Sequence, residues 1–148
     1  MIAALIIAGA LAAQQSPVRL DLVCEGQANV STSTTTNIGE PGGPVNFVTT
    51  NGRDRVSERV TVSINETGGR IRLPDSMLPT IRGRSEDGWR PLSNLQVGES
   101  QITGRMSFNI IDKPSVRIDR VTGTLEVRGL DTSFVGECQA IDPTARRF

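Results

Sequence analysis

Strict alternation of apolar and polar residues is the feature that most restricts what this chain of 148 residues can fold into. In the longest run, Ile102, Gly104, Met106, Phe108 and Ile110 are interleaved with polar residues, and shorter runs follow the same pattern at 18–24, 60–64, 116–118, 125–127 and 134–138. A period of two is typical of antiparallel strands that bury one face. We therefore expect an all-β fold, a single antiparallel β-barrel or β-sandwich of roughly seven to nine strands.

Turn signals separate several of these runs. Residues 119–123 predict a tight hairpin, with Gly123 in the left-handed backbone region and the Asp119 side chain bonding the turn amides. Residues 65–69, with Asn65 and two glycines, predict another turn.

Two segments interrupt the alternation, and both are expected to be loops. Residues 27–44 are rich in Ser, Thr, Gly and Pro, which favours a long mobile loop or a ragged hairpin. Residues 74–98 contain three prolines, at positions 74, 79 and 91, and prolines are excluded from central strands. This second segment is expected to be a structured excursion that covers one end of the domain like a lid.

The first thirteen residues resemble the apolar part of a secretory signal peptide. They carry no charged side chain, and residues 10–12 have the small-x-small pattern of a cleavage site. The run is too short to span a bilayer, which takes about 20 apolar residues. We expect a signal peptide at 1–13, a single β-domain at 14–148 without a transmembrane segment, and a periplasmic or secreted location. The alternative is a buried first strand or a misplaced start.

The chain has two cysteines, Cys24 and Cys138, near opposite ends of the predicted domain. In an oxidising compartment such a pair predicts a disulfide bond. It would join the strand at 18–24 to the strand at 134–138. The alternative is two separate buried thiols.

Composition excludes several classes of function. Sixteen basic residues balance sixteen acidic ones, whereas nucleic-acid binders usually carry a basic excess. The absence of histidine removes Ser-His-Asp and Cys-His catalysis and histidine-ligated zinc. We therefore expect no nucleic-acid partner, no metal site and no cofactor.

Asp87, Trp89 and Arg90 form the cluster that is most typical of a ligand site. An aromatic ring beside a carboxylate and a guanidinium suits a small polar ligand, and three more charged residues precede it, at 82, 84 and 86. The alternative is a tryptophan in the core or at its rim, flanked by solvated charges.

Asp119 and Glu126 could meet across the predicted hairpin, as glycoside hydrolysis by two carboxylates requires. Sixteen acidic residues create such pairs by chance, so a non-enzymatic role is favoured over catalysis, and we assign no catalytic residue.

Three short motifs are similar to those of a group of small exported bacterial proteins. They are Ile-Asp-Arg-Val-Thr-Gly at 118–123, Gly-Glu-Cys at 136–138 and Arg-Arg-Phe at 146–148. The group shares an I-D-R-x-T-G hairpin, a G-x-C strand and a basic-aromatic C-terminus. The resemblance implies export, an all-β fold and a bacterial source, and it carries no catalytic residues.

These observations favour a non-enzymatic binding or interaction module whose partner is a small ligand or an envelope protein. A deep apolar cavity lined by Met106 and Phe108 would favour the ligand. The alternative is an envelope structural or assembly protein without a ligand, which an exposed apolar patch or an unpaired edge strand would favour. A carboxylate-based hydrolase ranks third.

Overall fold

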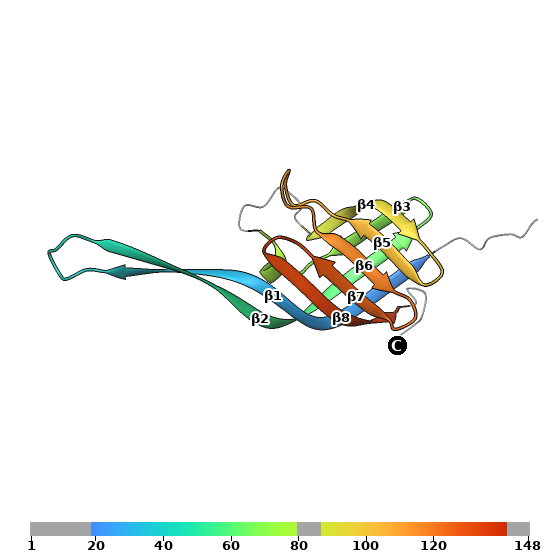
Figure 1. The fold of residues 1–148 in the computed structure, drawn as a ribbon, viewed down its shortest axis with the longest axis horizontal. Helices are drawn as coiled ribbons and strands as arrows, with labels where there is room; N and C mark the ends of the chain where they lie inside the picture. Colours follow the sequence, from blue (N-terminus) through green and yellow to red (C-terminus); the bar gives the residue numbers. More distant parts are fainter. Residues whose placement is uncertain (1–18, 80–86, 142–148) are drawn as a thin grey trace, which may run out of the picture.

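The alternating runs form antiparallel strands that close into one barrel (Figure 1). The computed structural model describes residues 19–79 and 87–141. Within these residues lie eight strands and one short 3₁₀ helix: β1 (Leu20–Ile38), β2 (Asn46–Asn65), β3 (Gly68–Arg72), η1 (Asp75–Met77), β4 (Trp89–Val97), β5 (Gln101–Arg105), β6 (Ser115–Asp119), β7 (Thr124–Arg128) and β8 (Thr132–Ala140). Each strand pairs with the next along the chain, and β8 pairs with β1. The predicted antiparallel barrel is confirmed.

The core fills the inside of the barrel with the apolar members of the alternating runs. Full burial of one large apolar side chain contributes about 1.5–3 kcal/mol to stability. No charged or polar side chain of the described residues is buried. The buried apolar residues are Leu22, Cys24, Ala28, Val30, Val60, Val62, Ile64, Ile71, Leu73, Met77, Ile102, Met106, Val116, Ile118, Leu125, Val127 and Phe134.

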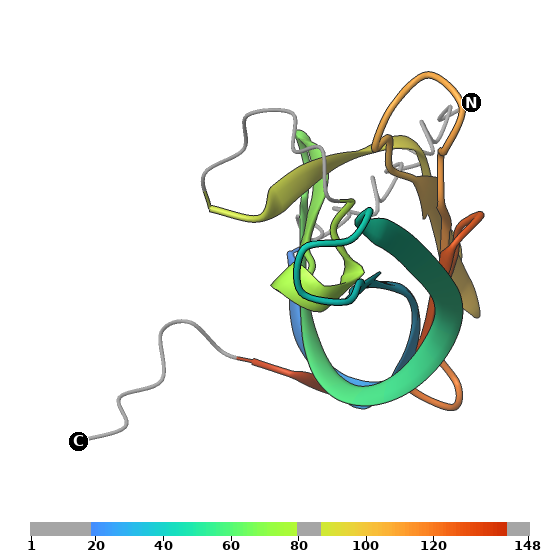
Figure 2. The same ribbon diagram turned by 90° about the vertical axis from the view of Figure 1, so that its left-hand side faces the viewer.

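The first two strands are much longer than the barrel needs. β8 pairs with β1 only as far as Val30, and β3 pairs with β2 only from Thr61 onward. Beyond these points β1 and β2 pair with each other alone, out to the pair Ile38↔Asn46. We call residues 31–53 the arm. Figure 1 shows it as a twisted two-stranded ribbon that projects from one end of the barrel, and Figure 2 views the barrel from that end.

The arm corrects the loop expected at 27–44 and agrees with the hairpin considered as the alternative. β1 continues without a register shift to Ile38, so most of that segment is strand. Threonine is β-branched and suits an extended backbone, and the opposite strand supplies Phe47, Val48 and two further threonines. The alternation fails here because neither face of the ribbon is buried, and the sequence pattern therefore looked like a loop.

The segment expected as a lid at 74–98 also contains a barrel strand. β4 begins at Trp89 and includes Pro91. Pro91 is paired with Arg70 of β3, whereas the pairing of β4 with β5 starts only at Ser93 and shifts register before Gln96. β4 is therefore a local edge at Pro91, which is where a strand tolerates proline.

The longest predicted strand ends early. β5 stops at Arg105, and residues 106–114 form a loop at the same end of the barrel as the arm. The Phe108 N–H donates to the Asp112 carbonyl at 3.0 Å, and the Asn109 side chain accepts the N–H groups of Ile111 and Asp112. These bonds curl the chain, so that Ile110 is 92% exposed instead of buried.

Both predicted turns are confirmed. Gly123 has a φ of +73°, and the Asp119 carboxylate accepts the N–H groups of Val121 and Thr122 at 2.9 and 3.1 Å. These bonds from the Thr122 and Val121 amides hold the pKa of Asp119 below its ordinary value of 3.8. At 65–69 the Asn65 side chain accepts the N–H of Thr67 at 2.9 Å.

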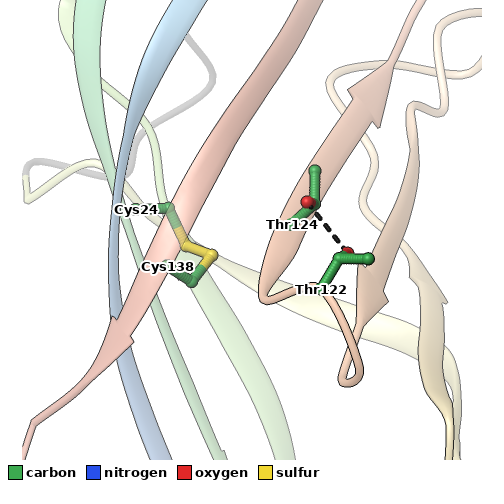
Figure 3. The surroundings of a disulfide bond; sticks show 4 residues. All are labelled: Cys24, Thr122, Thr124 and Cys138. Carbon is green, nitrogen blue, oxygen red and sulfur yellow. Dashed lines mark hydrogen bonds between the residues drawn. A yellow bond between two sulfur atoms is a disulfide. The ribbon is translucent and has the colours of Figure 1, made fainter.

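The pairing of β1 with β8 closes the barrel, and the predicted disulfide lies within it. Cys24 and Cys138 are direct partners across the two strands, with an S–S distance of 1.98 Å (Figure 3). Two residues farther along, Gly26 faces Gly136, and a Cβ on Gly26 would lie 2.0 Å from the Val135 carbonyl oxygen. The two strands approach too closely there for any larger residue.

Some predictions fall outside the described residues. They concern the signal peptide at 1–13, the charged residues Arg82, Arg84 and Glu86, and the C-terminal motif at 146–148.

Candidate functional site

The arm exposes apolar side chains near its tip. Ile38, Val45, Phe47 and Val48 are between 46% and 70% exposed, with Phe47 at the upper limit. The ribbon has no core of its own, and cross-strand contacts such as the 3.2 Å hydrogen bond between the Thr35 and Thr49 hydroxyls hold it together. Exposed apolar side chains gathered at one place are typical of an interaction site.

Among the residues that the structure describes, no strand pairs with either outer edge of the arm. On β1 the free edge runs from Thr32 to Ile38, and on β2 it runs from Asn46 to Val60. Free edges usually carry charges or prolines that prevent association with other strands. The β2 edge has such charges from Arg53 onward, whereas the β1 edge has neither a charge nor a proline.

A groove of about 610 Å³ lies at the end of the barrel from which the arm projects. It is bounded by η1, by the loop at 106–114 and by the β7–β8 turn, and the first arm residue, Ser31, also lines it. The Ser31 hydroxyl donates to the Asp131 carbonyl at 3.1 Å, which ties the base of the arm to the groove. The apolar lining consists of Met77, Leu78, Pro79, Phe108, Ile110, Ile111 and Leu130.

The predicted cluster at 87–90 does not converge on one point. Arg90 pairs with buried Ile71 and so turns inward, whereas Trp89 pairs with exposed Arg72 and turns outward. The side chain of Asp87 accepts the Trp89 N–H at 3.2 Å.

Cations lie on both aromatic rings of this region. The Arg70 guanidinium lies 4.4 Å from the centre of the Trp89 ring, and Arg90 lies 5.7 Å from the Phe108 ring. Phe108 lines the groove, so Arg90 reaches the groove wall only through that ring. Contact of Asp87, Trp89 and Arg90 with a ligand stays a prediction.

The acidic pair considered for hydrolysis does not form a cleft. Glu126 faces Arg117 across the hairpin and forms an ion pair with Arg128, while Asp119 faces Thr124 and caps the turn. Within the described ranges there is also no group of three or more potential metal ligands.

Sequence reasoning missed the arm as a functional element. The signal that could have indicated it is the run of six serines and threonines at 31–36, which ten residues separate from the segment Phe47-Val48-Thr49-Thr50. Two β-prone segments separated by a Gly-Pro-rich turn are typical of a hairpin, even when neither alternates.

No helix of the described part is long and apolar enough to cross a membrane. Comparison of the chain with known protein families, with curated proteins and with solved structures finds no match.

Proposed function

We propose that this chain is an exported, non-enzymatic interaction module that docks onto a protein partner through its arm. The free edges and the exposed apolar tip are the features that favour an assembly protein over a small-ligand module. The observation that carries the proposal is the arm itself, whose two free edges and exposed apolar tip are held out from a solid barrel. An isolated two-stranded hairpin is at best marginally stable in water. A partner that pairs with an edge or covers the tip would supply what the arm lacks.

Two further observations support an exported module. A disulfide between strands persists in oxidising compartments such as the periplasm or the extracellular space. Apolar side chains fill the barrel interior, which leaves little room there for a ligand. The barrel is therefore better suited to anchor the arm than to enclose a small molecule.

Site-specific photo-crosslinking in the cells that make the protein tests the docking role. A photoreactive residue at position 47, on the arm, is expected to give covalent protein adducts. The matched control is position 121, which is 82% exposed and lies on the β6–β7 turn at the opposite end of the barrel. Equal labelling at both positions, or none at position 47, would contradict a docking arm.

A second candidate is a small-ligand site in the groove, favoured by its apolar lining and by Phe108. Native mass spectrometry of the purified protein would then show a non-covalent mass that the variant Ile111→Asp lacks. An identical mass profile for the two proteins would exclude the groove as a ligand site.

A further inference from the structure

We propose that the partner of the arm is a second copy of this chain, bound edge to edge through β1. This inference rests on the proposed docking function and names its partner. The two copies would be related by a two-fold axis, so that the arms lie antiparallel and form a four-stranded sheet in the order β2-β1-β1-β2. Such an interface uses the same surface on both copies and closes at two chains.

The hydrogen bonds of the barrel show which backbone groups of β1 point to its free edge. The Cys138 N–H donates to the Gly123 carbonyl at 2.7 Å and so points away from β1, which makes Cys24 and Cys138 a non-hydrogen-bonded pair. The Asp21 carbonyl accepts the Ile141 N–H at 2.8 Å and therefore points toward the β8 side.

Backbone direction alternates along a strand, and β1 keeps one register with β2 from Leu20 to Ile38. Odd-numbered residues of β1 therefore direct their N–H and C=O groups toward the side that β8 occupies in the barrel. In the described part of the chain, this side is occupied as far as Ser31, whose hydroxyl donates to the Asp131 carbonyl, and no strand pairs with it farther along the arm. Residues 33, 35 and 37 thus present unpaired backbone groups.

The same geometry selects one register for two copies. Outward-directed residues must face outward-directed residues, so the numbers of two opposed residues sum to an even value. The register that uses residues 33, 35 and 37 places Ser33 opposite Asn37 of the second copy. Thr35 then lies on the two-fold axis, facing the Thr35 of the second copy in a hydrogen-bonded pair.

The side chains suit this pairing on β1 and oppose it on β2. Every residue from 31 to 37 is Ser, Thr or Asn, so uncharged polar groups face each other throughout, and Thr–Thr pairs are favourable across strands. The free edge of β2 spans 46–60, and its full symmetric pairing would place Arg53 opposite a second Arg53. Like charges that face each other directly destabilise a strand pair.

The apolar tip also finds a complement in this arrangement. Ile38 of one copy would lie opposite Thr32 of the other, next to Ser31, which lines the apolar groove. Each exposed tip would therefore lie beside the groove at the base of the other arm.

A cysteine on the proposed axis tests the register. A hydrogen-bonded pair has a Cα–Cα distance of about 5.5 Å, which a disulfide can span. Purified Thr35→Cys is expected to form an intermolecular disulfide in air while Cys24–Cys138 stays intact, as peptide mass mapping would show. The control is Thr49→Cys, on the residue opposite Thr35 in the hairpin, because two copies of position 49 would lie about 14 Å apart.

Proline at either outer edge of the arm tests which edge is used. Thr35 and Thr49 face each other, and both direct their N–H groups outward, so proline at either position leaves the hairpin bonds intact. Thr35→Pro is expected to raise the dissociation constant of the dimer roughly tenfold or more in sedimentation equilibrium, because each copy loses a hydrogen bond. Thr49→Pro is expected to leave it within about threefold, well below the tenfold that 1.4 kcal/mol represents.

Three outcomes separate this inference from the proposed function. A monomer at every concentration, together with equal cross-linking of the two cysteine variants, overturns self-pairing. Photo-adducts at position 47 that contain a different protein also overturn it, although the docking arm survives. Absence of any adduct at that position, in a protein that remains monomeric, overturns both.

Discussion

The barrel and the arm are built from the same two strands, yet they are held together differently. Within the barrel, β1 and β2 each have a neighbour on both sides, and their alternate residues are buried in a common core. In the arm the same two strands pair only with each other among the described residues, and nearly every side chain is exposed. A strand register can thus continue unchanged past the point where burial ends.

From this difference we expect that the arm depends on the barrel for its stability, whereas the barrel does not depend on the arm. Stability is distributed unevenly in such a molecule, and a segment without a core opens locally at low free energy. Changes in the barrel should therefore lower the global stability, and matched changes in the arm should leave it unaltered.

Loss of the disulfide is expected to have the largest effect. It closes a loop with a sequence separation of 114 residues, and the chain-entropy model gives about 4–5 kcal/mol for such a loop. Urea unfolding of the double variant Cys24→Ala, Cys138→Ala should show this loss in the barrel. A change below about 1 kcal/mol would mean that strand pairing alone holds β1 and β8 together.

Two phenylalanines offer the most direct comparison of the regions. Phe134 is fully buried in the barrel, whereas Phe47 is 70% exposed on the arm. Phe134→Ala should cost about 3–5 kcal/mol because it leaves a cavity, and Phe47→Ala should stay within about 0.5 kcal/mol of the wild type. Chemical denaturation measures both, and a similar cost for the two variants would refute the independence of the barrel.

Two turn glycines provide a smaller contrast. Gly123 on the barrel and Gly42 at the arm tip have φ values of +73° and +88°, and a side chain in this region costs about 1–2 kcal/mol. Gly123→Ala should lower the free energy of unfolding by that amount. Gly42→Ala should leave the free energy of unfolding unchanged and should instead accelerate amide hydrogen exchange in the arm. A lower free energy of unfolding for this variant would show that the arm tip contributes to the stability of the barrel.

The smallest effect concerns pH. Because the folded pKa of Asp119 is lowered, its stabilising contribution is complete above the unfolded value, near 3.8, and is lost as the pH falls through the folded pKa. Asp119→Ala should thus be less stable than the wild type at pH 7, and the difference should shrink below about pH 4.

A control separates the charge of Asp119 from its hydrogen bonds. Asp119→Asn keeps an acceptor for the amides of Val121 and Thr122 but does not titrate, so its stability relative to Asp119→Ala should not change between pH 7 and pH 3. A difference between the wild type and Asp119→Ala that is the same at pH 7 and pH 3 would assign the pH effect to another carboxylate.

The barrel could be predicted from the sequence because its signals are local. Alternation at 60–64 and 134–138 marks strands with one buried face, and the Asp119–Gly123 turn has the residue types that its geometry requires. The disulfide was predicted from the expected oxidising compartment and from the presence of two cysteines, and its pairing is confirmed.

The free edge of the arm and the early end of β5 could not be predicted, because both depend on residues that are distant in the sequence. Alternation continues through Met106 and Phe108, yet the chain turns away once Asp112 and Asn109 can bond its backbone. No residue between 31 and 36 indicates that the pairing of β8 with β1 ends at Val30. The free edge beyond that point therefore could not be predicted from these residues. Within the cluster predicted at 87–90, Trp89 and Arg90 turn to opposite faces because they are neighbours on a strand.

The connection of β8 to β1 also orders the assembly of the molecule in time. All other strand pairs join strands that are consecutive in the sequence, so each pair can form as soon as both of its strands have been synthesised. The arm can therefore form its hydrogen bonds while the chain is still incomplete. The closing pair must wait for β8, the last strand of the barrel, and it bears the largest loop-closure entropy. Until the barrel closes, the apolar faces of its strands are accessible to other chains, so the protein is most prone to aggregation just before closure.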